Sequence, residues 1–113
     1  MTEFTYCKLE IFIPATCLPT LRETLRNMDA GHIGNYDSCL SYSEVISNWR
    51  PLAGSNPYIG QKNMLSEEPE LKVETVCRTE NVRSTLAAIR RMHPYEEPVI
   101  NVIPLFHISS AVR

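Results

Sequence analysis

The sequence lacks the features that mark several common classes of protein. No apolar run approaches the roughly 20 residues that span a bilayer, and the first four residues lack the basic end and apolar stretch of a signal peptide. Lysine and arginine number 11 against 13 aspartates and glutamates, and the formal net charge of −2 gives no basic surface for nucleic acid. We therefore expect one cytoplasmic domain over residues 1–113, with neither a membrane nor nucleic acid as a partner.

Short motifs for metal binding and for common catalytic sites are also missing. The four cysteines, Cys7, Cys17, Cys39 and Cys77, form no CxxC pair, so we expect reduced thiols that pack as small hydrophobic groups. The sequence contains no GxSxG, HExxH or P-loop pattern. These absences favour a protein that is not an enzyme.

The sequence does contain a near-repeat. Lys8 and Glu10 recur as Lys72 and Glu74, each 64 positions later. Each copy has an apolar extended run, a segment with helical spacing and a compact turn, which covers residues 31–36 in the first copy and 93–98 in the second. The repeat predicts two βα units related by a pseudo-twofold axis, with both turns at one edge of the molecule.

Local patterns predict four strands and two helices. We expect strands over 6–13, 36–46, 71–78 and 99–106, and a long loop over 47–69. Thr16 and Thr79 are expected to cap the two helices, Gly31 to end the first in a left-handed conformation, and Pro94 to stop the second.

This order of elements favours one fold class. Right-handed crossovers select an α+β, ferredoxin-like βαββαβ sandwich, with a four-stranded antiparallel sheet and both helices on one face over a core of residues 5–106. The uncovered face of the sheet needs a cover, so we predict a homo-oligomer.

The two turns supply the candidate site. We expect the first and third strands to be parallel and central, which would make both helices end at one edge and bring the turns together. His32, His93 and Glu96 would then offer nitrogen and oxygen ligands for a divalent metal ion. Asn35, Tyr36, Tyr95 and Glu97 would complete a ligand-binding site. Alternatively, residues 93–98 form a rigid corner that binds nothing.

The long loop is a second candidate. Trp49, Arg50 and Tyr58 combine aromatic and arginine side chains as protein contact surfaces do, so they are the expected partner-binding residues. The alternative is a bent hairpin that packs against a neighbouring subunit.

Three motifs in order, Gly31-His32-Ile33-Gly34-Asn35-Tyr36, Pro51-Leu52-Ala53-Gly54-Ser55-Asn56-Pro57-Tyr58-Ile59-Gly60 and His93-Pro94-Tyr95-Glu96-Glu97-Pro98, resemble the YqfO-like proteins. That Nif-three-type family is often labelled as related to GTP cyclohydrolase type 2. The resemblance covers residues 5–106 and matches the inserted middle domain of the larger members. His93-Pro94-Tyr95-Glu96 is also similar to the corresponding corner of the CutA divalent-cation-tolerance proteins.

The resemblance implies a stand-alone PII-like or CutA-like domain that assembles as a trimer, with the 47–69 loop in the place of the PII signalling loop. The larger YqfO-like members resemble hydrolases with a two-metal site, but its ligands lie in flanking domains that this sequence lacks. Their activity therefore does not carry over.

These observations lead to one functional hypothesis and two alternatives. The first is a non-enzymatic, oligomeric domain that senses a ligand or a metal ion, with a divalent metal as the first ligand class to test. The alternatives are a small enzyme that acts on a nucleotide-like or other small molecule at a subunit interface, and a protein-interaction module that works through the 47–69 loop.

Overall fold

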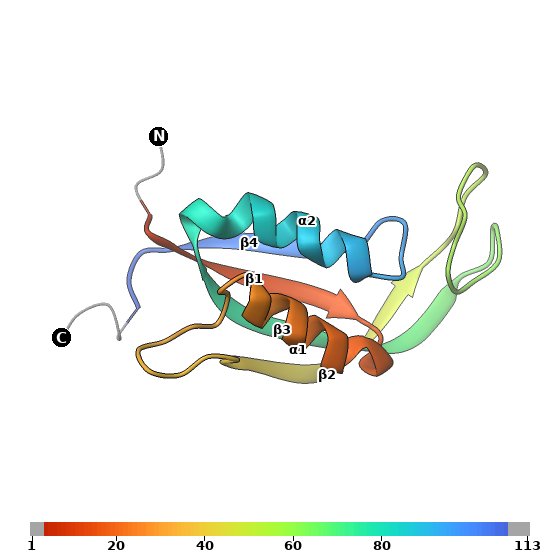
Figure 1. The fold of residues 1–113 in the computed structure, drawn as a ribbon. Coiled ribbons are helices and arrows are strands. Elements are labelled where there is room, and N and C mark those ends of the chain that lie inside the picture. Colours follow the sequence, from red (N-terminus) through yellow and green to blue (C-terminus); the bar gives the residue numbers. More distant parts are fainter. Residues whose placement is uncertain (1–3, 109–113) are drawn as a thin grey trace.

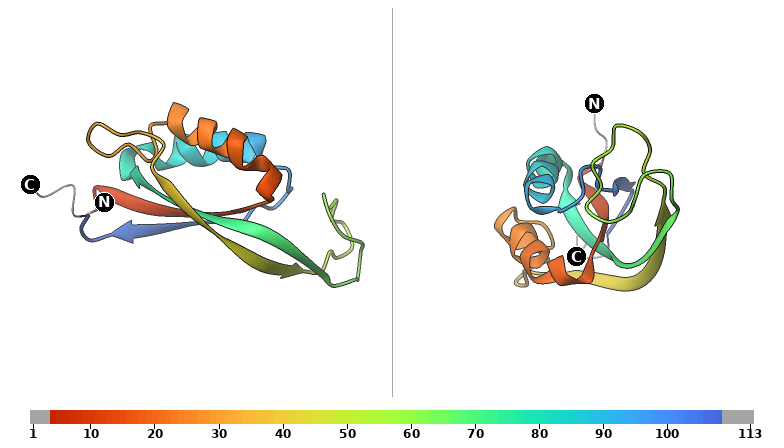
Figure 2. Two further views of the ribbon diagram at one scale, coloured as in Figure 1. Left: turned by 90° about the horizontal axis from the view of Figure 1, so that it is seen from below. Right: turned by 90° about the vertical axis from the view of Figure 1, so that its right-hand side faces the viewer.

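A single antiparallel sheet with two helices on one face forms the domain (Figures 1 and 2). The structure is a computed structural model and describes residues 4–108. Its elements are β1 (Tyr6–Ile13), α1 (Leu18–Asn27), β2 (Leu40–Trp49), β3 (Ser66–Arg78), α2 (Val82–Met92) and β4 (Ile100–Leu105), with 3-10 turns at Ala15–Cys17 and Thr79–Asn81. The strand order is β2-β3-β1-β4, and every neighbouring pair is antiparallel. The predicted α+β, ferredoxin-like fold is confirmed.

The core lies between the sheet and the helices. Side chains in β1 alternate strictly, and Leu9, Ile11 and Ile13 on the helix side are fully buried. Leu21 and Leu25 of α1 pack in the same cluster, and each such aliphatic side chain contributes roughly 1.5–3 kcal/mol by leaving water. None of the described helices is long and apolar enough to cross a membrane.

The helix ends differ in detail from the predicted ones. Asp29, with φ of 60°, is the left-handed residue after α1, and Ala30 N–H donates to Leu25 O at 2.9 Å as in a Schellman motif. The predicted caps Thr16 and Thr79 lie inside the 3-10 turns instead, and neither helix has a side-chain cap bond. His93 is extended before Pro94, so the end of α2 is as predicted.

Strands β2 and β3 form a longer hairpin than the sequence predicts. Their ladder continues to the pair Trp49 and Ser66, which leaves a loop of residues 50–65 in place of the predicted 47–69. Pro69 lies inside β3, beyond the Ile13 and Leu71 pair where β1 ends. Because β3 has a neighbour on only one side there, a proline without an N–H group is tolerated.

Charged residues occupy the middle of the sheet face that the helices leave uncovered. Lys8 Nζ lies 2.8 Å from Glu74 Oε1 and 3.3 Å from Glu10 Oε2, and Lys72 Nζ lies 3.5 Å from Glu10 Oε2. Bonds to Glu74 and then Glu10 raise the pKa of Lys8. The pKa of Glu10 is lowered first by a hydrogen bond from Asn101 and then by one from Lys8. The centre of this face is therefore ionic.

We expect Gly31→Ala to destabilise the domain by about 2–4 kcal/mol. Gly31 has φ of +77°, and an added Cβ would lie 2.5 Å from the Cys39 carbonyl oxygen and 2.9 Å from Thr75 Oγ1. Urea unfolding followed by circular dichroism measures the loss.

Gly54→Ala is the matched control, because Gly54 has φ of +90° but no atom within 4 Å of the added Cβ. It should cost about 1 kcal/mol from backbone strain alone. Equal losses in the two variants would contradict the close packing inferred at Gly31.

Candidate functional site

The structure separates the two turns that were expected to meet. Strand β1 pairs antiparallel with β3, so the prediction that these strands are parallel is wrong, and α1 and α2 end at opposite ends of the sheet (Figure 1). In the turn after α1, the Gly31 backbone N–H donates to the carbonyl oxygen of Val76, and Val76 pairs with Lys8 in the β1 and β3 ladder. The turn after α2 is anchored by the hydrogen bond between the His93 ring and the carbonyl oxygen of Phe12 in β1. The four steps along β1 from Lys8 to Phe12 span roughly 14 Å.

His32, Asn35 and Tyr36 lie at the first of these ends. His32 Nδ1 is 2.7 Å from Asp29 Oδ1, and Ile33 and Tyr36 exchange two backbone hydrogen bonds across the Gly34-Asn35 turn. All three predicted site residues are exposed, Tyr36 by 74%. This end is therefore a surface turn with a local His32 and Asp29 pair.

His93, at the other end, is a buried structural residue. Its Nε2 lies 2.7 Å from the Phe12 carbonyl oxygen and must carry the proton, while its Nδ1 accepts from the Tyr95 backbone N–H at 3.1 Å. Burial lowers the pKa of His93, opposed by the bond to Phe12 and by the charge of Glu70. Both ring nitrogens are thus engaged in the neutral form.

The predicted metal set is not assembled within one subunit. His32 lies at the opposite end from His93 and Glu96, and His93 has no free lone pair. In the described range 4–108, no three histidine, cysteine, aspartate or glutamate side chains are grouped so as to hold a metal ion. The expectation of a metal at His32, His93 and Glu96 is therefore corrected for the single chain.

Tyr95 is the centre of an aromatic cluster at the corner of residues 93–98. Its ring centroid lies 5.0 Å from that of His93, 5.7 Å from Trp49 and 5.9 Å from Tyr58, all in tilted arrangements. Such tilted pairs are favourable ring geometries. The cluster joins α2 and β4 to the hairpin loop.

The loop of residues 50–65 bends back onto this corner. The Asn56 backbone N–H donates to Glu96 Oε1 at 2.7 Å, and Trp49 Nε1–H donates to the Ile59 carbonyl at 3.0 Å. At the base of the loop, Asn63 N–H donates to Pro51 O at 2.7 Å. The loop therefore packs against its own subunit, which neither sequence-based alternative described.

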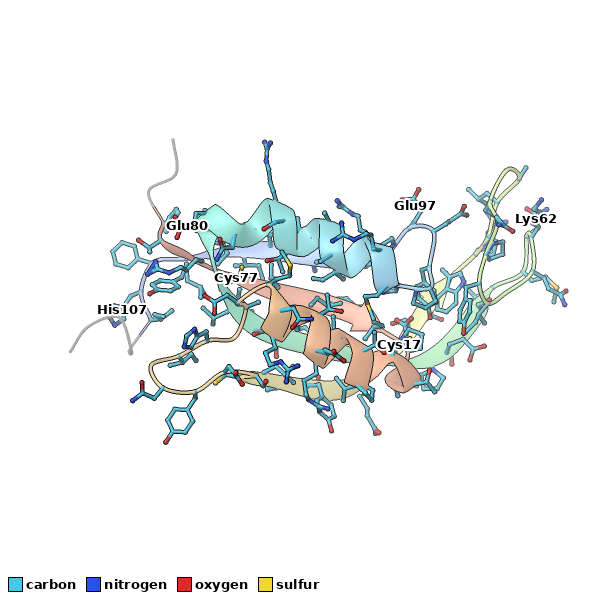
Figure 3. All side chains as sticks on the ribbon, in the orientation of Figure 1. Cys17, Lys62, Cys77, Glu80, Glu97 and His107 are labelled. Atoms are coloured by element: carbon cyan, nitrogen blue, oxygen red, sulfur yellow. The ribbon has the colours of Figure 1, made fainter. Side chains whose placement is uncertain are left out.

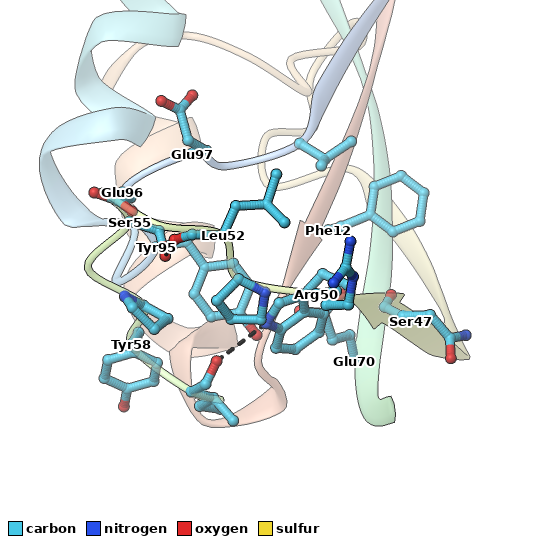
Figure 4. Close-up of a pocket in the computed structure, with 16 residues that line it drawn as sticks. Phe12, Ser47, Arg50, Leu52, Ser55, Tyr58, Glu70, Tyr95, Glu96 and Glu97 are labelled. Carbon is cyan, nitrogen blue, oxygen red and sulfur yellow. Dashed lines mark hydrogen bonds between the residues drawn. The ribbon is translucent and has the colours of Figure 1, made fainter. Parts of the chain in front are cut away.

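Loop, corner and strand ends line a cavity of about 560 Å³ that opens to solvent (Figure 4). The predicted partner residues Trp49, Arg50 and Tyr58 line it together with the predicted ligand residues Tyr95 and Glu97. Figure 3 places Glu97 at this end of the molecule and Cys77 toward the other. The structure thus brings to one cavity several residues that the sequence analysis assigned to two separate roles.

Sequence reasoning missed several residues of the cavity wall, namely Phe12, Leu52, Glu70 and Val99. Glu70 is only 4% exposed. It follows Pro69 in a polar stretch that resembles a loop, so no local signal marked it as buried. Only the extra length of the β2 and β3 ladder places it against the corner.

Glu70 and Tyr95 give the cavity its unusual electrostatics. Among the described residues, neither Glu70 Oε2 nor Tyr95 Oη has a hydrogen-bond partner, although both atoms are sealed from solvent. Burial, and then the neighbouring Glu70, raise the pKa of Tyr95 far above its usual value. The wall holds three carboxylates, Glu70, Glu96 and Glu97, against the single guanidinium of Arg50.

Curated relatives match this chain over most of its length. A "GTP cyclohydrolase 1 type 2 homolog" from Halalkalibacterium halodurans is 40% identical over 104 residues, covering 92% of the chain and 28% of the relative. Proteins with the same name from Listeria monocytogenes and Bacillus subtilis are 37% and 35% identical, with 27% and 26% of their lengths covered. The chain therefore spans about a quarter of these relatives. No protein-family model matches it.

Solved structures give the same relationship and a wider fold group. A Bacillus cereus protein related to NIF3 aligns with a TM-score of 0.80 at 30% identity, covering 95% of this chain and 27% of that one. CutA from Archaeoglobus fulgidus, a divalent cation tolerance protein, aligns at 0.70 and 15% identity, covering 94% and 89%. CutA1 from Shewanella aligns at 0.72 and 16%, covering 97% and 90%. The resemblance predicted from the three motifs is confirmed, and the CutA likeness is one of fold.

The buried His93 makes stability fall in acid. Its folded pKa is lowered, so below about pH 6.5 the unfolded chain takes up a proton that the folded chain resists. Stability is retained above that pH and is lost as the pH falls toward the folded pKa. His93→Gln should lessen the loss between pH 7.5 and 5.5 by up to roughly 1 kcal/mol, measured by urea unfolding at both values.

His107→Gln is the control, because His107 is exposed. It should keep the wild-type dependence on pH. A wild-type dependence in His93→Gln as well would show that the buried imidazole is not its source.

Proposed function

We propose that this chain, a homologue of one segment of the GTP cyclohydrolase 1 type 2 homologs, is a non-enzymatic, oligomeric domain that binds a small-molecule ligand for a regulatory role. The observation that carries the proposal is the cavity at the 93–98 corner. Its volume, about 560 Å³, is in the range of small-molecule sites, which are mostly apolar with a few placed polar groups.

Two features of the cavity support binding in preference to catalysis. Apolar side chains form most of the wall, with the rings of Trp49, Tyr58 and Tyr95 on one side. His93, directly behind Tyr95, is committed through both nitrogens to backbone groups. A proton carrier must exchange its proton with a reacting group, and His93 would have to give up a structural bond to do so.

A small-molecule library screened by thermal shift tests the proposal. We expect compounds that raise the Tm of the wild type to lose most of their effect in Tyr58→Ala, because the aromatic wall is removed. They should keep their effect in Tyr36→Ala, which removes an exposed tyrosine at the opposite end. Stabilising compounds should be recovered unchanged by mass spectrometry after incubation.

Three results would contradict this function. These are a screen without stabilising compounds, equal effects in the two tyrosine variants, and turnover of the compounds. Turnover would favour the small-enzyme alternative.

Assembly as a homotrimer is the second part of the proposal. The outer edge of β2 is unpaired over Leu40–Trp49 in the described chain, and long free strand edges are sites where other strands pair. Large apolar side chains are exposed along the same hairpin, including Ile46 by 62% and Leu65 by 68%. Such surfaces in a folded domain mark contacts with other chains.

Light scattering at micromolar concentration should give about three times the 12.9 kDa mass of one chain. Ile46→Lys should shift the population toward smaller species, because a charge would be buried between subunits. The control Arg83→Lys alters an exposed position on α2 and should leave the mass unchanged. A wild type that is monomeric throughout would refute the trimer.

A further inference from the structure

The wall of the cavity is mostly apolar. Aromatic and aliphatic side chains form the larger part of it, namely Phe12, Trp49, Pro51, Leu52, Pro57, Tyr58, Ile59, Tyr95 and Val99. Three of these, Leu52, Tyr58 and Val99, are more than half exposed. A ligand that covers them removes apolar surface from water, which favours an apolar molecule.

The polar atoms of the inner wall are already engaged with the protein or out of reach. Trp49 Nε1–H and Ser55 Oγ–H donate to carbonyl oxygens of the loop at 3.0 and 2.7 Å. Glu70 Oε2 and Tyr95 Oη are sealed from solvent, so a ligand in the open cavity does not contact them. A polar group placed against this wall would lose its hydrogen bonds to water without gaining others. The part of a ligand that lies inside the cavity is therefore apolar.

The polar side chains that a ligand can still engage lie at the rim of the cavity. Asn48 and Arg50, at the end of β2 and directly after it, are exposed, as are Glu96 and Glu97 at the corner. Glu96 already accepts the hydrogen bond from the Asn56 backbone N–H at 2.7 Å. Arg50 and Glu97 are therefore the rim charges that no hydrogen bond or ion pair engages within residues 4–108.

Arg50 is the one cation among the described residues that line the cavity, and it has no partner of opposite charge. Figure 4 shows Arg50 on the side of Phe12, with Leu52 between it and Glu97, whose carboxylate points away from the rings. A guanidinium binds a carboxylate through two parallel N–H···O bonds. The rim thus offers a place for one carboxylate beside the apolar wall.

We propose that the cavity binds an apolar carboxylic acid in its ionised form, with the ring or hydrocarbon chain against the aromatic wall and the carboxylate paired with Arg50. This inference rests on the proposed ligand-binding function and names the chemical class of its ligand. The apolar body matches a wall without accessible donors, and the carboxylate supplies the partner that Arg50 lacks. A cation paired with Glu97 would instead lie away from the rings.

The probe 3-phenylpropanoate is suitable because it joins a phenyl ring to a carboxylate through a short apolar linker. The single tryptophan, Trp49, lines the cavity, so its fluorescence reports binding, with calorimetry as a second measurement. We expect wild type to bind the acid at least about fivefold more tightly than the neutral 3-phenylpropanamide or the cationic 3-phenylpropylammonium. Decanoate, titrated in parallel, shows whether a hydrocarbon chain or a ring is the better body.

Variants at the rim test the role of Arg50. Arg50→Gln should weaken binding of 3-phenylpropanoate about fivefold and leave the affinity for the amide unchanged. Arg50→Lys should keep part of the affinity, because the charge remains but the planar fork is lost. Arg83→Gln, which changes an exposed arginine on α2, should lose none. An unchanged Tm in all three variants would show that a loss of affinity is not a loss of folding.

The following results would overturn the carboxylate class. They are equal binding of the acid, the amide and the ammonium, an Arg50→Gln variant that binds the acid as wild type does, and tighter binding of the ammonium that Glu97→Gln abolishes. Library compounds that depend on Tyr58 but are all neutral or cationic would also refute it, while the ligand-binding function would stand. The loss of all Tyr58-dependent binding would refute the proposed function itself.

Discussion

The antiparallel pairing of β1 with β3 is the constraint on which the rest of the structure depends. Its register sets Glu10 opposite Glu74 and Lys8 two positions away, so the near-repeat in the sequence becomes a compact charge network on one face. On the opposite face the same register brings Leu9, Ile11 and Ile13 beneath the helices. Because these two central strands are antiparallel, the two βα units that begin with them run in opposite directions.

The repeat predicted the fold correctly but not the position of its turns. The bounds of β1 are those predicted from its alternating apolar residues, and the end of α2 follows from Pro94. A twofold axis between two neighbouring antiparallel strands, however, exchanges the ends of the sheet. The same symmetry that indicated two βα units therefore places His32 and His93 far apart.

The candidate site was only partly predictable, because it depends on contacts between distant segments. Trp49, Tyr58 and Tyr95 could be predicted as candidate residues because they are aromatic and lie in motifs that contain proline. Their common location depends on the bond from Asn56 to Glu96, across 40 positions, which no local pattern encodes. Glu70 was missed because Pro69 marks a loop in most contexts, whereas the free edge of β3 accommodates it as a strand residue.

The comparisons show this fold in two settings. In the GTP cyclohydrolase 1 type 2 homologs the matching region is 26–28% of a longer chain, whereas CutA proteins consist almost entirely of it, with 89% and 90% of their lengths covered. The loop and the corner are the parts in which a binding site can differ between them.

The base of the hairpin loop has a consequence for how such sites diversify. The last ladder pair, Trp49 and Ser66, is followed by the bond from Asn63 N–H to Pro51 O, which closes a narrow neck below the tip of the loop. Because of this neck, insertions or replacements within residues 52–62 would leave the register of β2 and β3 unchanged. The tip could therefore change in sequence and length while the sheet and the core beneath it keep their geometry.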